Sequence, residues 1–230
     1  MTLHGVELKV CSDAEEVASV VADELVEAAR VGHSLALTGG TSPGRAYELA
    51  ARREPDWSGA SLWWGDDRCV PPDDERSNFR LARETLLDQV AAQPREVQRI
   101  RGELGAEAAA DEYDRLLDGA RLDFVLLGLG PDGHTASLFP NQPTLDERER
   151  RAIPAEAKLE PFVDRVTMTV PVLSSAPAVL FIVSGEEKAE AVERAFAQPP
   201  SPATPASLIR SAAGRTTVVA DDAACARLRG

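Results

Sequence analysis

The chain has 230 residues but few cysteines, few lysines and no long apolar run. Its three cysteines, Cys11, Cys69 and Cys225, lie far apart without metal-ligand spacing, which argues against a disulfide framework and a zinc site. The longest apolar run, 178–183, has the length of a strand and is too short to span a membrane. The N-terminus also lacks the charged start and apolar stretch of a signal peptide, so we expect a cytoplasmic protein.

Acidic residues outnumber basic ones by 38 to 25, which gives a formal net charge of −13. Such a chain repels nucleic acid and anionic membranes unless its basic groups are clustered, and here they form no run longer than a pair. We therefore expect neither partner. Only three basic residues are lysines, so an anion site must be built from a few well-placed groups and backbone amides.

Short apolar runs alternate with longer amphipathic stretches, which is typical of an α/β fold with a mostly parallel sheet. A capping-box pattern of Ser12 and Glu15 predicts the start of a first helix that ends near Arg30. The continuous apolar run 122–130 indicates a strand buried on both faces. The other expected elements are strands at 6–10, 34–39, 61–67, 165–170, 178–185 and 216–221, and helices at 44–53, 77–90, 103–117, 186–196 and the C-terminus.

Two proline-rich stretches interrupt this pattern, at 140–161 and 198–205. We interpret both as loops, because neither half of the chain beside them is able to bury a core alone. The sequence therefore predicts a single domain over residues 1–230. Its expected fold is a Rossmann-like, mostly parallel twisted sheet flanked by helices on both faces.

Ligands bind open α/β sheets at the carboxyl ends of the strands, and four loops at such ends carry unusual residues. Glycines and hydroxyls at a helix start offer backbone N–H groups to an anion, although a tight turn is the simpler interpretation. The loop is not a P-loop, because Gly44 is followed by Arg45 and Ala46. The residues of this first loop are Thr38, Gly39, Gly40, Thr41 and Ser42.

Charged residues mark two further loops. Arg68 follows Asp66 and Asp67 at a strand end, either as a solvated ion pair or as a fork that binds a phosphate. Lys188 falls in the first turn of an expected helix, where a cation opposes the helix dipole. An anion in front of Lys188 explains that placement, and a solvated surface lysine is the alternative.

The loop after the apolar strand carries a histidine. Gly128, Gly130 and Gly133 match the G-x-G-x-x-G pattern of dinucleotide sites, but Pro131 stiffens the loop and no strand-end acid follows at the required spacing. A histidine beside a carboxylate can act as a general base or, alternatively, can cap a helix start. The pair is His134 with Asp132, whereas the other two histidines, His4 and His33, sit in unremarkable surface contexts.

Several catalytic motifs are absent from the sequence. There is no G-x-S-x-G elbow, no H-E-x-x-H and no paired C-x-x-C, so neither a serine-hydrolase nor a metal-hydrolase mechanism has support. A base beside an anion site indicates water activation or proton transfer on a small phosphorylated compound. A dinucleotide oxidoreductase and a non-catalytic sugar-phosphate-binding module are the other open readings.

Three segments together resemble the 6-phosphogluconolactonase family, within the glucosamine-6-phosphate isomerase/6-phosphogluconolactonase superfamily. They are TGGTSPG, GDDRCVPPDDERSNF and GLGPDGHTASLFP, and the likeness extends through RVTMTV and SGEEK to PASLIR. The resemblance implies a cofactor-free carboxylic ester hydrolase of the oxidative pentose phosphate pathway. Its substrate would be 6-phospho-D-glucono-1,5-lactone. The family usually reads Asp-Glu-Arg where this chain has Asp66, Asp67 and Arg68.

The resemblance also implies roles for individual residues. His134 would take a proton from water as it attacks the lactone carbonyl and return the proton to the ring oxygen. Asp132 would orient His134 or a sugar hydroxyl. The other implied substrate-binding residues are Thr38, Gly39, Gly40, Thr41, Ser42, Arg68, Arg165 and Lys188 for the phosphate and developing charge, Asp66 and Asn78, which would meet sugar hydroxyls or fix the loop, and Gly130.

The nearest rival is a glucosamine-6-phosphate isomerase or deaminase. In that family the histidine is typically followed by Ile-Ala-Phe-Asn-Glu-Pro, whereas here residues 135–140 read TASLFP and lack the glutamate. A sensor of this fold usually carries a DNA-binding helix-turn-helix, for which this acidic chain has neither room nor charge. We therefore expect a small-molecule partner, no metal, and a monomer or weak homo-oligomer.

Overall fold

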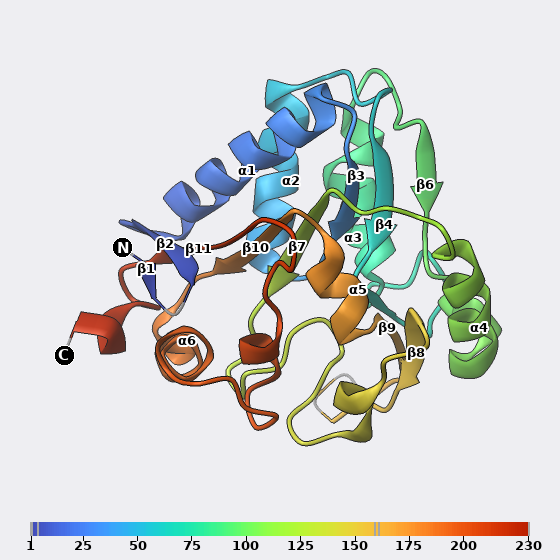
Figure 1. The fold of residues 1–230 in the computed structure, drawn as a ribbon. Helices are drawn as coiled ribbons and strands as arrows, with labels where there is room; N and C mark the ends of the chain where they lie inside the picture. Colours follow the sequence, from blue (N-terminus) through green and yellow to red (C-terminus); the bar gives the residue numbers. More distant parts are fainter. Residues whose placement is uncertain (1, 4, 159, 161, 230) are drawn as a thin grey trace.

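A computed structural model describes residues 2–3, 5–158, 160 and 162–229, so His4 and Pro161 lie outside the described residues (Figure 1). Its main sheet contains β1 Thr2–Leu3, β2 Val6–Cys11, β3 Ser34–Leu37, β4 Ser61–Trp64, β6 Glu96–Gln98, β7 Phe124–Gly128, β10 Ala178–Val183 and β11 Arg215–Asp221. The strand order is β1-β2-β11-β10-β7-β3-β4-β6. Every pairing is parallel except that of β1 with β2, which confirms the predicted mostly parallel sheet.

Helices cover both faces of this sheet, as predicted. They are α1 Ala14–Arg30, α2 Thr41–Arg53, α3 Asn78–Thr85, α4 Ala106–Leu116, α5 Val170–Ser175 and α6 Ala189–Val192. In Figure 1, α1, α2 and α3 group on one side of the sheet, and α5 and α6 lie on the other. The apolar face of α1 packs into the core, with Val17, Val21 and Leu25 fully buried. No helix within the described ranges is long and apolar enough to cross a membrane.

A second, three-stranded antiparallel sheet corrects two of the predicted strands. It consists of β5 Asp66–Arg68, β8 Ala152–Ala155 and β9 Arg165–Met168, in the order β5-β9-β8. The expected strand 61–67 therefore divides at Gly65. That residue donates its N–H to the carbonyl of Leu37 in the main sheet and accepts the N–H of Met168 from the small sheet. Sequence patterning also missed β6 and β8, which have only three and four residues.

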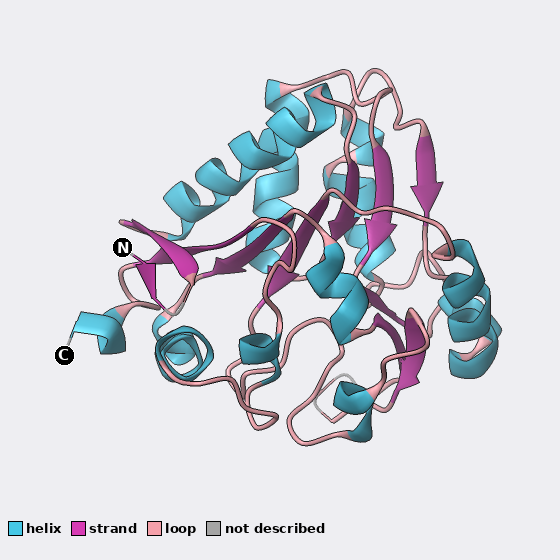
Figure 2. Cartoon of the chain, in the orientation of Figure 1, coloured by secondary structure: helices cyan, strands magenta, loops and turns pink. Residues whose placement is uncertain are grey.

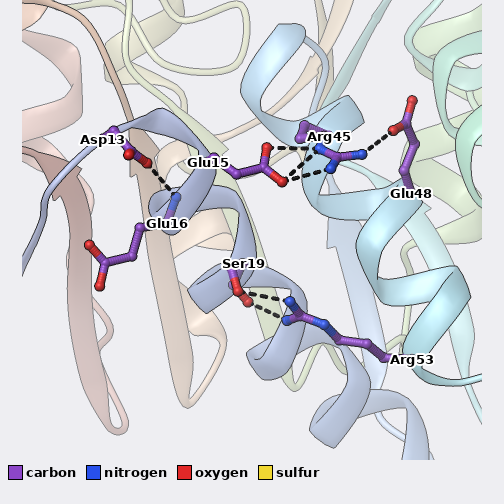
Figure 3. Close-up of polar contacts among 7 residues, drawn as sticks. All are labelled: Asp13, Glu15, Glu16, Ser19, Arg45, Glu48 and Arg53. Carbon is purple, nitrogen blue, oxygen red and sulfur yellow. Dashed lines mark hydrogen bonds and ion pairs between the residues drawn. The ribbon is translucent and has the colours of Figure 1, made fainter.

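The helix boundaries differ from the prediction at several ends. The side chain of Asp13, not Ser12, caps α1 by accepting the N–H of Glu16 (Figure 3). The Glu16 carboxylate in turn accepts the N–H of Ser12. The predicted Ser12–Glu15 capping box is therefore wrong: the cap lies one residue later, and the returning bond from Glu16 reaches Ser12 rather than the cap residue Asp13. The expected helix 186–196 consists of a 3-10 turn, the short α6 and a π-helical turn. The expected helices 77–90 and 103–117 are α3 and α4, each preceded or followed by a 3-10 turn.

A salt bridge and hydrogen bonds join α1 and α2 at their exposed sides (Figure 3). The Arg45 guanidinium of α2 lies 2.6 Å from the Glu15 carboxylate of α1 and 2.7 Å from that of Glu48 within its own helix. Arg53 of α2 donates to the carbonyl and hydroxyl of Ser19 at 2.6 and 2.8 Å. Exposed pairs of this kind contribute little stability individually, and apolar packing carries the contact. Their main consequence is that Arg45 is engaged away from the loop that opens α2.

Two buried tyrosines fix the carboxyl ends of β3 and β4. The Tyr47 hydroxyl donates to the carbonyl of Thr38 at 2.7 Å and accepts the N–H of the same residue at 3.0 Å. In the same way, the Tyr113 hydroxyl donates to the carbonyl of Trp64 at 3.0 Å and accepts the N–H of Trp64 at 2.9 Å. Each phenol thus satisfies the two backbone groups at which a strand gives way to a loop. Of these two strand ends, that of β3 lines the pocket described next, through Thr38.

Candidate active site

A pocket of about 370 Å³ lies at the carboxyl ends of the parallel strands. In Figure 2 the arrowheads of the central strands point toward the side where the long loops gather. The loops after β3, β4, β7 and β10 all reach the pocket, as the sequence predicted for this fold. Strand order explains their meeting, because β7 lies beside β3 and the chain reverses its direction across the sheet there.

His134 and Asp132 form a hydrogen-bonded pair on the loop after β7. Nδ1 of His134 lies 2.6 Å from Oδ1 of Asp132, and the same oxygen accepts the backbone N–H of His134 at 3.1 Å. The hydrogen bond and charge of His134 outweigh burial and lower the pKa of Asp132, so the carboxylate is ionised at neutral pH. An ionised carboxylate only accepts, which places the imidazole proton on Nδ1 and leaves Nε2 as the basic nitrogen.

The loop is closed tightly around this pair. The N–H of Gly130 bonds to the carbonyl of His134 at 2.8 Å, and a Cβ at Gly130 would collide with the imidazole. No helix begins at His134, since the residues after it form turns and a bridge between Thr135 and Leu138. The helix-cap interpretation of this histidine is therefore wrong.

Arg68 and Arg165 lie opposite each other in the small sheet. They are register partners across β5 and β9, and both line the pocket. Arg165 is only 4% exposed, and its guanidinium lies 5.5 Å from the centre of the Phe139 ring. Burial, and after it the charge of Arg68, lowers the pKa of Arg165. Two neighbouring cations at one wall of a pocket favour an anion between them.

A network of side chains holds Arg68 and the buried Asp66. The Nδ2 group of Asn78 donates to the carbonyl of Asp66 at 2.9 Å and to its carboxylate at 3.2 Å. Its Oδ1 accepts a hydrogen bond from Nη1 of Arg68. The other carboxylate oxygen of Asp66 accepts the Ser137 hydroxyl at 2.6 Å. Asn78 and Ser137 thus hold the Asp66 carboxylate from two sides and fix its position in the pocket wall.

Lys188 approaches from the loop after β10. It is half-buried, and burial lowers its pKa against the opposing charges of Glu187 and Asp132. The residue ends a 3-10 turn, Glu186–Lys188, directly before α6. That turn is fixed by Asp221, whose carboxylate accepts the N–H of Gly185 at 3.0 Å. The interpretation of a fully solvated surface lysine is therefore wrong.

The loop after β3 supplies backbone donors. Gly39 lies against the Asn78 side chain, and a Cβ at Gly39 would collide with its amide oxygen. The helix α2 begins at Thr41, so the N–H groups of Thr41 and Ser42, two residues that line the pocket, have no intrahelical partners. The hydroxyl of Ser42 lies 2.8 Å from that of Ser184, which joins this loop to the loop of Lys188.

Nearly all the sequence-predicted site residues line this one pocket. Asp132 lies behind His134 rather than on the wall. The sequence assigned no role to Ser137, Ser184 or Glu187. Only the fold brings Ser137 to Asp66 and Ser184 to Ser42, and Glu187 lines the pocket beside Lys188. Within the described ranges, no group of three or more His, Cys, Asp or Glu residues could hold a metal ion. The predicted residues on the wall are Thr38, Gly39, Gly40, Thr41, Ser42, Asp66, Arg68, Asn78, Gly130, His134, Arg165 and Lys188.

Comparison with known proteins gives one consistent family. The model of glucosamine-6-phosphate isomerases/6-phosphogluconolactonase matches residues 12–218. The 6-phosphogluconolactonase of Streptomyces coelicolor is 35% identical over 96% of this chain and 94% of that protein. The human 6-phosphogluconolactonase is 34% identical over 94% of this chain and 92% of that protein. The solved structure of 6-phosphogluconolactonase from Trypanosoma cruzi superposes with a TM-score of 0.88 at 26% identity, over 100% of this chain and 99% of that one.

Proposed function

The chain belongs to the glucosamine-6-phosphate isomerase/6-phosphogluconolactonase family, and we propose that it hydrolyses 6-phospho-D-glucono-1,5-lactone with His134 as the base that activates water. This reaction is the lactonase step of the pentose phosphate pathway, and its product is 6-phospho-D-gluconate. The observation that carries the mechanism is the pairing of His134 with Asp132 in a pocket that also holds Arg68, Arg165 and Lys188.

The pair supplies the proton transfers of the reaction. Nε2 of His134 takes a proton from water as the water oxygen attacks the carbonyl carbon of the lactone. The tetrahedral intermediate then collapses, the bond from that carbon to the ring oxygen breaks, and the imidazolium returns the proton to the ring oxygen. Asp132 holds the imidazole in the tautomer that this cycle requires and stabilises its charged form.

The cations supply orientation and charge stabilisation. Arg68, Arg165 and Lys188 hold the phosphate and the negative charge that develops on the carbonyl oxygen. The backbone N–H groups at the start of α2 add donors for the phosphate. Because the lactone is already reactive toward water, most of the rate gain comes from holding it against the base. Asp66 and Asn78 are placed to accept or donate hydrogen bonds to sugar hydroxyls.

The test is a comparison of two substrates. Purified protein is given freshly generated lactone, with spontaneous hydrolysis subtracted and the product read by coupled oxidation. In a parallel assay it is given glucosamine 6-phosphate, and ammonia release is measured. We expect lactone hydrolysis well above background and no ammonia. Ammonia release without lactonase activity would refute the proposal and favour the deaminase branch of the family.

A further inference from the structure

Asp67 is a buried carboxylate that does not line the pocket, and the mechanism above does not use it. It is 2% exposed, on β5 between Asp66 and Arg68. One of its oxygens accepts the N–H of Asn78 at 2.7 Å and that of Arg68 at 2.8 Å. The other accepts the N–H of Phe79 at 3.0 Å. A hydroxyl, that of Ser77, adds a fourth bond at 3.2 Å.

These donors all belong to the start of α3 or to the site itself. Asn78 and Phe79 are the first residues of α3, so Asp67 occupies the position where the helix dipole favours a negative charge. Asp67 therefore fixes the main chain of Asn78, and the Asn78 amide in turn binds both Arg68 and Asp66. Asp67 is therefore linked through Asn78 to two residues that line the pocket, Arg68 and Asp66.

The need for such a link follows from the repulsion between Arg68 and Arg165. These two guanidinium groups belong to directly opposed residues, so Arg68 is pushed away from Arg165 unless another group holds it. The Asn78 amide oxygen accepts from Arg68 and supplies that hold. We propose that Asp67 is a positioning residue, which sets Asn78 and through it keeps Arg68 and Asp66 ready for the sugar phosphate. The inference rests on the lactonase function proposed above.

The charge of Asp67, and not only its shape, matters to this role. Four donors converge on the side chain, and an ionised carboxylate is the group that only accepts. An amide of the same size would turn an N–H₂ group toward one of those donors and leave it unsatisfied. Burial raises the pKa of Asp67 to about 6, against the opposing effect of its hydrogen bonds, so the carboxylate is ionised at pH 7.5.

The test uses Asp67→Asn and Asp67→Glu in lactonase assays at pH 7.5. For Asp67→Asn we expect KM to rise about tenfold or more with kcat changed less than about threefold, because the affected groups hold substrate and are not the base. For Asp67→Glu, which keeps the charge, we expect KM within about threefold of wild type. Wild-type KM in Asp67→Asn, or equal impairment in both variants, would overturn the inference.

A matched control separates positioning from loss of stability. Asp13→Asn removes another carboxylate that caps a helix start, at α1, and Asp13 is not among the residues that line the pocket. We expect it to lower the melting temperature and leave KM unchanged. An equal rise of KM in Asp13→Asn would overturn the inference. If Asp67→Asn does not fold, Ser77→Ala is the substitute, since it removes one donor to Asp67 and changes no residue that lines the pocket. We then expect KM to rise with kcat changed less than about threefold, and a wild-type KM would overturn the inference.

The outcome for Asp67 is distinguishable from the outcome for the proposed function. A wild-type protein that hydrolyses the lactone, with Asp67→Asn at wild-type KM, keeps the function and refutes the positioning role. A wild-type protein without lactonase activity refutes the function. In that case calorimetric titration with 6-phosphogluconate as the probe still compares wild type with Asp67→Asn, and equal affinities would refute the positioning role.

Discussion

Arg68 and Arg165 are direct partners across two antiparallel strands, so that two guanidinium-bearing residues face each other at one wall of the pocket. Like charges in this relationship destabilise a sheet, and burial of Arg165 adds to that cost. Under the proposed function, a phosphate bound between the two groups would offset both effects.

Arg165→Met is expected to lose substrate affinity with little change in stability. The apolar side chain removes the repulsion from Arg68 together with the attraction to Asp66 and Asp67, so the free energy of unfolding should change by less than about 1 kcal/mol. KM should rise about tenfold or more, because one phosphate ligand is lost. Melting curves with and without inorganic phosphate, together with steady-state kinetics, check both effects. A variant that melts lower and keeps its KM would contradict this account of the pair.

The buried Asp67 carboxylate makes a pH-dependent contribution to stability. Its pKa rises to about 6 from an ordinary value of 3.8, because burial disfavours the charged form. The folded state therefore binds more protons than the unfolded state between about pH 4 and 6, and this group's contribution falls as pH rises through that window, by roughly 3 kcal/mol. Denaturant unfolding at pH 4 to 7.5 measures this contribution as the difference in the free energy of unfolding between wild type and Asp67→Asn. A difference that is constant across this range would contradict the prediction.

Tyr47→Phe and Tyr113→Phe form a matched pair of substitutions. Each removes one hydroxyl that hydrogen-bonds both the N–H and the carbonyl of the residue at a strand end. Each should therefore lower the free energy of unfolding by about 1–3 kcal/mol. Only Tyr47 holds Thr38, which lines the pocket, so only Tyr47→Phe should also raise KM. Equal KM values in the two variants would show that the end of β3 does not need this phenol to place its loop.

Gly130→Ala should abolish most activity without unfolding the protein. The added methyl group would collide with the imidazole of His134 and displace it from Asp132. We expect kcat to fall about a hundredfold or more, in the range found when a general base is lost. Gly119→Ala is the control: its Cβ meets nothing within 4 Å, but its φ of +75° makes the substitution costly to the backbone. Similar losses of kcat in both variants would point to backbone destabilisation rather than to the histidine.

Sequence patterns predicted the long elements well and the short ones poorly. The parallel strands and the loops at their carboxyl ends were predictable, because apolar runs and glycine-rich turns are local signals. The division of the strand at Gly65 was not, since it depends on contacts with Leu37 and Met168 from distant segments. The small sheet was missed for the same reason, and with it the opposition of Arg68 and Arg165.

The site likewise contains contacts that the sequence could predict and contacts that it could not. His134 and Asp132 are two residues apart, so their pairing was readable from a glycine-rich loop. Ser137 and Ser184 acquire meaning only through their contacts with Asp66 and Ser42, which lie 71 and 142 residues away in the chain. No local pattern records such distances.

The most direct measurement of the central claim is the lactonase rate of His134→Ala beside that of His33→Ala. His33 precedes β3, at the end of the sheet opposite the pocket, and serves as the matched histidine control. With spontaneous hydrolysis subtracted, we predict that His134→Ala falls to near background and that His33→Ala keeps the wild-type rate. A His134→Ala variant that folds and retains the wild-type rate would show that another group activates the water, and would contradict the mechanism.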